Sequence, residues 1–326
     1  MTTKGAAALA AVIATWVVYA LLSGWWFDSS LRGVAPYVYA PVLIVVGGVG
    51  GWGLGRASPR VAGVVTVALA TLFLVGVLSS GAPAKGPIGY ANANAAVAVQ
   101  LIALSGLVAM RSRAGRWAWP ALAISVLTVV ANRSAAAMAV AAPLVATVAL
   151  AARFSPGRRR WPAAGLAVAT LAATAVGLVA LARRVVWPTI ALEAFDEVRQ
   201  LLWLQAWGAF RDAEVAGRGP GFFEALNLLK DPDQSSAHSL PLQVAVELGG
   251  IGLALLILLY LAGLGVAVNA ATPARSWIAV AAWTALAVHS FVDHLLEYWP
   301  IPLAAGLVLG YGLVAQPDAE PQDEVI

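Results

Sequence analysis

Long apolar stretches recur along almost the whole chain, with short polar segments between them. A run of about 20 apolar residues is long enough to cross a bilayer as a helix. Ten such runs lie near 6–24, 36–55, 61–80, 93–110, 117–132, 134–152, 161–182, 240–268, 276–292 and 298–315. The pattern predicts an all-α, polytopic integral membrane protein with about ten transmembrane helices.

The chain divides into four parts. Residues 1–182 hold the first seven predicted helices, 183–239 form one large hydrophilic loop, 240–315 hold the last three helices, and 316–326 form an acidic tail. Within the loop, Thr189 to Arg211 has the periodicity of an amphipathic helix, so we expect it to lie along the membrane surface. The run AGRGPGFFE at 216–224 then breaks the helix with three glycines and a proline.

Composition supports a membrane protein and removes some chemistry. Hydrophobic residues make up 61% of the chain and charged residues 11%, whereas soluble domains are roughly half apolar and a quarter charged. The absence of cysteine excludes disulfides, thiolate metal sites and cysteine nucleophiles. The net charge of +4 does not indicate a nucleic-acid partner, because the arginines lie in short clusters between apolar runs.

The basic residues indicate the orientation. On the ten-helix pattern, eleven Lys and Arg residues fall on one side of the membrane, and three in short loops on the other, namely Arg32, Lys85 and Arg133. Positively charged loops stay in the cytoplasm. We therefore expect both termini inside the cell and the large loop outside, in a plasma or inner membrane.

Three glycines at four-residue spacing, Gly47, Gly51 and Gly55, lie within the second predicted helix. They lack the lysine of a phosphate-binding loop. Small residues at this spacing favour close packing against another helix.

Polar residues at the end of the large loop are the first candidates for chemistry. His238 ends the loop, Pro241 suits the first turn of a helix, and Glu247 then lies roughly 9 Å along that helix, with Gln243 one turn earlier on the same face. A charge at the centre of a membrane helix costs about 2.5 to 3.5 kcal/mol, so Glu247 is a functional candidate. The plain alternatives are a carboxylate satisfied by a nearby arginine and a solvated loop histidine.

Arg218 lies in the glycine-rich turn. Such a turn could direct backbone N–H groups at an anion. The alternative is a simple loop bend that carries a solvated arginine.

Two further acidic patterns suggest metal sites. Asp231-Pro-Asp233 has the spacing of a metal-binding Asp-x-Asp, but nucleotide sugars are absent from the outer face, so an acidic loop is the simpler interpretation. His289, Asp293 and Glu297 recur every four residues and would share a face on one continuous helix. They indicate either a metal or proton site or a polar helix end, and we favour the helix end, with Asp293 kept as a candidate for an outer cavity.

The order of several short motifs resembles the O-antigen ligase and polymerase superfamily. These are GPIGYANANA (86–95), ANRSAAAM (131–138), VRQLLWLQAW (198–207), the GxGPGxF-like turn (217–223) and HSLPLQVAVELGGIG (238–252). They cover roughly residues 80–265 and include the large outer loop. The chain departs from the family where Ser239 replaces the usual asparagine and where about ten helices replace twelve or so.

The resemblance implies a metal-independent, inverting transfer of a glycan from a polyprenyl diphosphate to an acceptor hydroxyl on the outer face, without a cofactor. It implies that Arg133, Arg199 and Arg218 bind the diphosphate and that His238 orients or deprotonates the acceptor. For Glu247, the resemblance implies either a role as a base or a structural role. Secondary candidates for the cavity are Asn92, Asn94, Gln243 and Asp293.

The chemistry fits the resemblance and leaves alternatives open. Arginines oppose the charge of a departing diphosphate, and histidine suits a general base near neutral pH. The implied partners are the bilayer, the lipid-linked glycan and an acceptor lipid, polysaccharide or protein. A polymerase of the same superfamily, a transporter or flippase, and a non-enzymatic envelope-polysaccharide assembly protein are the alternatives.

Overall fold

The computed structural model describes residues 3–81, 85–111, 113–154, 160–229 and 235–315. The predicted Asp231-Pro-Asp233 motif and the acidic tail lie outside the described residues. The described residues form helices and connecting turns without strands, as the apolar pattern predicts: α1 (Thr3–Trp26), α2 (Leu31–Arg56), α3 (Pro59–Ser79), α4 (Ala91–Ala109), η1 (Arg113–Ala118), α5 (Trp119–Ala131), α6 (Ala135–Arg153), α7 (Trp161–Ala182), α8 (Thr189–Arg211), α9 (Phe222–Leu226), α10 (Leu240–Val268), α11 (Pro273–Phe291), η3 (Leu295–Glu297) and α12 (Pro300–Gly312).

The protein is a polytopic membrane protein. Within the described ranges, seven helices are long and apolar enough to cross a membrane: α1, α2, α3, α4, α6, α7 and α10. Helices α5 and α12 are apolar but shorter, with 13 residues each. Crossings by α5, α11 and α12, and so the total of about ten, stay a prediction.

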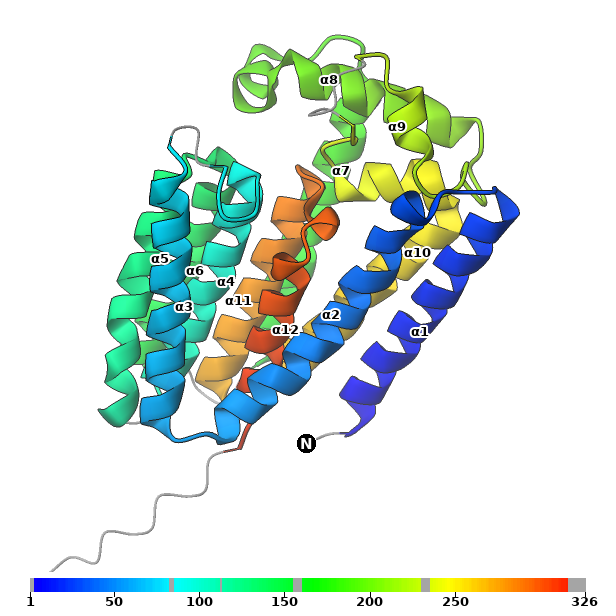
Figure 1. The fold of residues 1–326 in the computed structure, drawn as a ribbon. Coiled ribbons are helices and arrows are strands. Elements are labelled where there is room, and N and C mark those ends of the chain that lie inside the picture. Colours follow the sequence, from blue (N-terminus) through cyan, green and yellow to red (C-terminus); the bar gives the residue numbers. More distant parts are fainter. Residues whose placement is uncertain (1–2, 82–84, 112, 155–159, 230–234, 316–326) are drawn as a thin grey trace, which may run out of the picture.

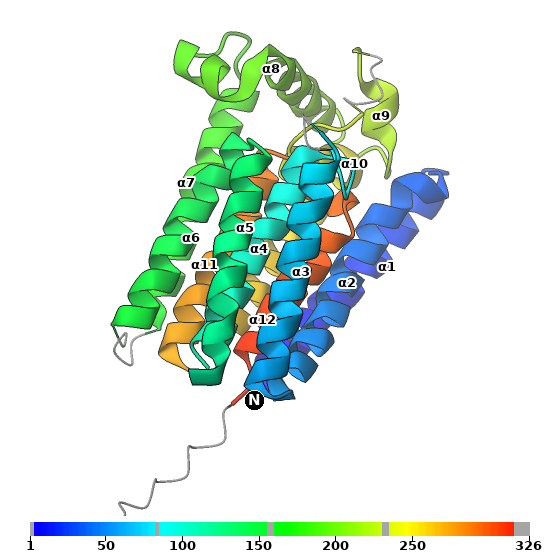
Figure 2. The ribbon, with the colours of Figure 1, turned by 60° about the vertical axis from the view of Figure 1, so that its left-hand side comes forward.

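The helices form a bundle with α8 and α9 across one end (Figure 1). We call this covered end the outer end and the opposite one the inner end, after the predicted orientation. Helix α4 lies inside the bundle, where α3, α5, α6, α11 and α12 contact it. Of an 18-residue apolar stretch of this helix, 89% is buried. A second view shows α3, α5 and α6 side by side on one flank and α1 and α2 on the other (Figure 2).

Glycines bring α2 and α12 into close contact. A Cβ atom on Gly47 or Gly51 would collide with the backbone carbonyls of Leu303 and Leu307 on α12. Gly306 of α12 faces the backbone of α2 in the same way. The glycine spacing is therefore a packing motif, as predicted, because small residues let helix backbones approach.

Helix α8 is broken, in contrast to the continuous periodic segment that the sequence predicts. Asp196 has φ 69° and ψ 167°, which divides α8 into two helical pieces. Its carboxylate accepts a hydrogen bond of 2.8 Å from the Arg199 backbone N–H. Asp196 thus caps the second piece, because a short acidic side chain satisfies an N–H that the first turn leaves free.

The glycine-rich turn packs into a break in α10. Gly249 has φ 65° and interrupts α10, while the N–H groups of Arg218 and Gly219 each donate 2.9 Å bonds to the carbonyls of Val246 and Glu247. Gly217, with φ 73°, faces the same carbonyl region so closely that a Cβ would collide with it. Glycine is required here both for its conformation and for its size.

Helix α11 ends at Phe291, before the acidic residues of its predicted continuation. His294 and Leu295 then lead into the short η3 helix. His289, Asp293 and Glu297 therefore do not share one continuous helix, and that interpretation of their spacing is wrong. The polar helix end favoured from the sequence is what the structure has.

Candidate functional site

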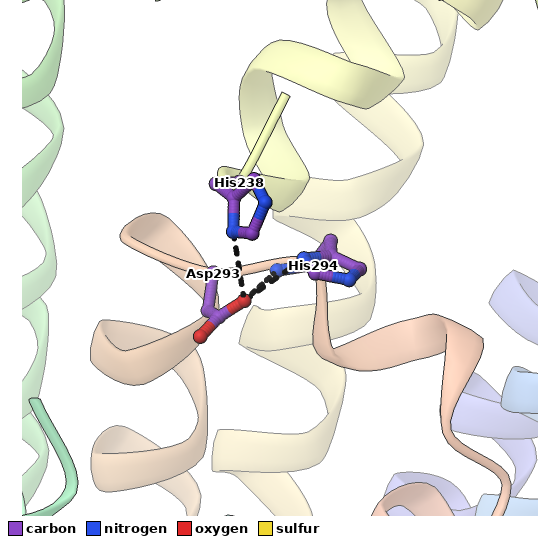
Figure 3. A group of neighbouring side chains, drawn as sticks. All are labelled: His238, Asp293 and His294. Atoms are coloured by element: carbon purple, nitrogen blue, oxygen red, sulfur yellow. Dashed lines mark hydrogen bonds and ion pairs between the residues drawn. The ribbon is translucent and has the colours of Figure 1, made fainter. Parts of the chain in front are cut away.

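A cluster of His238, Asp293 and His294 lies at the outer end, where the start of α10 meets the end of α11 (Figure 3). Nδ1 of His294 is 2.9 Å from Oδ1 of Asp293, and Nδ1 of His238 is 3.7 Å from the same oxygen. All three residues are buried. The backbone fixes the arrangement, because the Leu240 N–H donates a 3.0 Å bond to the Asp293 carbonyl.

The Asp293 carboxylate is held by three further donor groups. The Tyr90 hydroxyl donates to it at 2.9 and 3.1 Å, and the Asn92 amide at 2.6 Å. The His294 backbone N–H donates at 2.8 Å. A buried carboxylate needs such donors to stay ionised, so these contacts fix a negative charge beneath the two imidazole rings.

His238 keeps free hydrogen-bonding capacity in a constrained position. It has φ 46°, which is uncommon for a residue other than glycine, and only 6% of it is exposed. Neither ring nitrogen has a hydrogen-bond partner among the described residues. Strained backbone and unpaired buried polar atoms concentrate at functional sites.

The two histidines are tuned in opposite directions. Burial lowers the pKa of His238, and the nearby Asp293 carboxylate only partly offsets this. Burial also opposes protonation of His294, but there the adjacent Asp293 outweighs it and raises the pKa. Burial would raise the pKa of Asp293, yet contacts with both histidines hold it well below its ordinary value. The arrangement places a neutral imidazole beside an ion pair.

Of the three predicted arginines, Arg199 is the one whose charge acts on the histidines of this cluster. Its charge contributes to the lowered pKa of His238 and opposes the rise in the pKa of His294. The Asp196 cap orients it through an ion pair of 2.9 Å. The Nε–H of Arg199 is buried and has no partner among the described residues, so one guanidinium donor remains for a ligand.

Glu247 lies one layer away, and both of its carboxylate oxygens are occupied. Oε2 accepts from the Tyr37 hydroxyl at 2.7 Å and the Gly221 N–H at 2.8 Å. Oε1 accepts from the Gln243 amide at 2.7 Å and the Phe223 N–H at 3.2 Å. No arginine in the described part of the chain bonds to this acid, in contrast to the carboxylate–arginine pair considered from the sequence. It fastens the glycine-rich turn to α10 and α2.

The remaining predicted site residues lie elsewhere. Arg133 is exposed in the turn between α5 and α6. The Arg218 side chain is 41% exposed, and its Nη2 is 3.8 Å from Asp212. Asn94 caps the turn before α4, where it accepts from the Ile88 N–H and donates to the Gly86 carbonyl. None of the three touches the His238 cluster within the described part of the chain.

A cavity of about 330 Å³ opens beside the cluster. Its polar walls come from α2, α9, α10 and η3, with Arg32, Tyr39, Glu224, Gln243, Glu247, His294 and Glu297 among them. His294 belongs both to the cavity wall and to the cluster. Gln243 is thus the one of the four secondary candidates that lines this cavity. Asp293 belongs to the cluster, and Asn92 donates a hydrogen bond to it.

A family described as O-antigen ligase matches residues 120–257 of the chain. The match covers less than half of the 326 residues, and it shows that this segment is similar to the O-antigen ligase family. The matched segment includes His238, Glu247 and all three predicted diphosphate arginines. No curated protein matches the chain. The match supports the resemblance read from the short motifs, and this similarity points to a membrane enzyme of the ligase or polymerase type.

Some residues of the site were not singled out from the sequence. Tyr90 lies two positions before the Asn-x-Asn motif, and His294 directly follows Asp293. A search for polar residues that flank the predicted helix ends would have found both. Arg32, Glu224 and Glu297 were not identified from the sequence as residues of one cavity, because elements far apart in the sequence bring them together there.

The cluster also has the donor atoms of a metal site. His238, Asp293 and His294 each offer one ligand atom, all within 4.8 Å of one another. Two imidazoles and a carboxylate are ligands that Zn²⁺ accepts. The sequence predicts no metal, and the Asp293 carboxylate is already fully hydrogen-bonded by protein donors.

Proposed function

We propose that the protein transfers a glycan from a polyprenyl diphosphate to an acceptor hydroxyl at the outer end of the bundle, with His238 as general base. The observation that carries the proposal is the state of His238: buried, neutral by its lowered pKa, and without a partner on either ring nitrogen. A base of this kind contributes about 10²- to 10⁴-fold to a rate. Both ligase and polymerase activity fit this chemistry.

The step is a substitution at the anomeric carbon. The acceptor oxygen forms a bond to that carbon, and the bond from the carbon to the diphosphate oxygen breaks, so the configuration inverts. The acceptor proton passes to His238, and the diphosphate leaves with the bonding electron pair. Asp293 and its donors hold the charge that the imidazolium gains.

Arg199 is the cation that we assign to the departing diphosphate, since its buried Nε–H has no partner among the described residues. Guanidinium donors in a poorly hydrated site stabilise developing phosphate charge. Arg133 and Arg218 are exposed at the same outer end. They are proposed as secondary contacts for the lipid diphosphate.

A transfer assay in proteoliposomes tests the proposal. Polyprenyl-diphosphate-linked glycan is supplied, and release of the free lipid diphosphate is measured for wild type, His238→Gln and the control Arg153→Gln, an exposed residue at the inner end. We expect His238→Gln to lower the rate at least about 100-fold, with the control unchanged. Wild type that binds the lipid without releasing diphosphate would favour a flipping or assembly role.

The proposed orientation, with the outer end facing away from the cytoplasm of a plasma or inner membrane, can be tested by labelling. The chain contains no cysteine, so Glu193→Cys on α8 and Arg153→Cys at the inner end can each be labelled alone. A membrane-impermeant maleimide on intact spheroplasts should modify only Glu193→Cys. Modification of Arg153→Cys alone would reverse the orientation.

A further inference from the structure

The cavity beside the cluster is acidic. Glu224 of α9 and Glu297 of η3 line it together with Glu247, against the single arginine Arg32. Neither the Glu224 nor the Glu297 side chain accepts a hydrogen bond from a described residue, and the His294 Nε2 atom lies 3.9 Å from Glu297. The two carboxylates face the cavity and can still accept hydrogen bonds. Such a cavity disfavours a diphosphate and favours hydroxyl or ammonium donors.

The two sides of the cluster therefore differ in charge. The Arg199 side supplies a guanidinium that acts on His238 and His294. The cavity side supplies carboxylates, with His294 as the shared wall. Arg199 is not among the residues that line the cavity. Because charge complementarity selects partners, the anionic donor should favour Arg199 and the other substrate the acidic cavity.

We infer that this cavity binds a neutral or amino sugar of the acceptor, whose hydroxyl or ammonium groups hydrogen-bond to Glu224 and Glu297. That this sugar belongs to the acceptor rests on the proposed function, whereas the binding of the sugar does not. A volume of about 330 Å³ falls at the lower end of small-molecule sites, which suits one or two sugar rings. A uronic acid is disfavoured here, since its carboxylate would face two others.

The cavity is also held in shape without a ligand. The Tyr39 hydroxyl donates a 2.6 Å bond to the Glu297 carbonyl, which ties η3 to α2. Glu247 ties the α9 turn to α10 from below through Gly221 and Phe223. A preformed site loses less entropy on binding, so isolated small sugars should give a measurable signal.

Saturation-transfer NMR on the full chain in nanodiscs tests the inference with three matched probes. These are the methyl glycosides of glucosamine, glucose and glucuronic acid, which differ in charge but share the ring. We expect dissociation constants to increase in that order. Glu297→Gln and Glu224→Gln should each weaken glucosaminide binding about 10-fold, whereas Glu193→Gln, an exposed carboxylate on α8, should leave it unchanged.

The outcomes separate this inference from the proposed function. Tightest binding of the glucuronide, or glucosaminide binding that both Gln variants leave intact, would overturn the inference even if transfer proceeds. Sugar binding that depends on Glu297 in a protein that never releases lipid diphosphate would keep the binding site and remove the transferase. In an active enzyme, Glu297→Gln should raise the acceptor KM more than it lowers kcat, which a purely structural residue would not do.

Discussion

The two ends of the bundle use polar side chains in opposite ways. At the inner end, Arg111, Arg160 and Arg275 each donate to a carbonyl that follows a helix, those of Ala57, Ala270 and Val314. These cations complete helix ends and complement their dipoles. At the outer end, both ring nitrogens of His238 and the Nε–H of Arg199 are buried without partners in the described structure.

This difference separates structural charges from functional ones. A buried polar group that finds a protein partner contributes to folding, whereas one that finds none costs free energy. The sequence alone does not distinguish a structural arginine at one end from a functional arginine at the other. Its hydrogen bonds show which role it has.

The largest effect should come from replacing an arginine at the outer end, compared with the same replacement at the inner end. Arg199→Gln removes the cation that we assign to the leaving group, so kcat should fall about 100-fold, the usual loss for one transition-state donor. Arg153→Gln at the inner end should change the rate less than about twofold. Equal losses in both variants, measured in the proteoliposome assay, would erase the distinction between the ends.

Glu247 should behave as a structural residue in spite of its depth. Glu247→Gln replaces one of two buried accepting oxygens by an NH₂ group, which cannot accept the hydrogen bonds made there. An unsatisfied buried group costs about 1 to 3 kcal/mol, so the thermal unfolding midpoint in detergent should decrease. The rate should fall only about 10-fold, because the turn loosens while His238 stays in place. Abolished transfer with an unchanged unfolding midpoint would instead make Glu247 a base.

The pH profile should follow His238. Because burial lowers the pKa of His238, the base is neutral at pH 7, and activity should fall only as the pH drops below the ordinary value of about 6.5. Asp293→Asn removes a negative charge that favours both imidazolium forms, so the acid limb should move to lower pH as the maximal rate decreases. A limb that moves to higher pH would contradict the assignment.

The smallest effect should come from chelation. Tyr90, Asn92 and the His294 N–H already satisfy the Asp293 carboxylate, so EDTA should leave the transfer rate unchanged. A rate that falls with EDTA and returns with Zn²⁺ would assign the three ligand atoms to a catalytic metal.

Much of the fold was predictable because membrane helices follow from one local property, the length of an apolar run. The run 161–182 coincides with α7 and 240–268 with α10. The predicted run 36–55 begins five residues after the start of α2 at Leu31. Arg32 and the prolines interrupt the apolar pattern in the first turn, which Ser30 caps. The break in α8 was missed, because the cap that Asp196 forms there competes with helical periodicity only locally.

The site was predictable only where its residues share a short motif. His238, Gln243 and Glu247 all lie between positions 238 and 247, and the motif identifies all three. Their partners come from distant helices: Tyr37 lies 210 positions from Glu247, and Tyr90 lies 203 from Asp293. No periodicity encodes such long-range contacts, so the structure is needed to show that Glu247 is saturated and His238 is not.

We propose His238 as the neutral base beside a charged His294–Asp293 pair, and a titration of the histidines is the decisive test. The chain has three histidines, so ¹⁵N-histidine NMR in nanodiscs gives three signals, assigned with His289→Gln and His294→Gln. We expect His238 to titrate below, and His294 above, the ordinary histidine pKa. A protonated His238 beside a neutral His294 at pH 7 would contradict it.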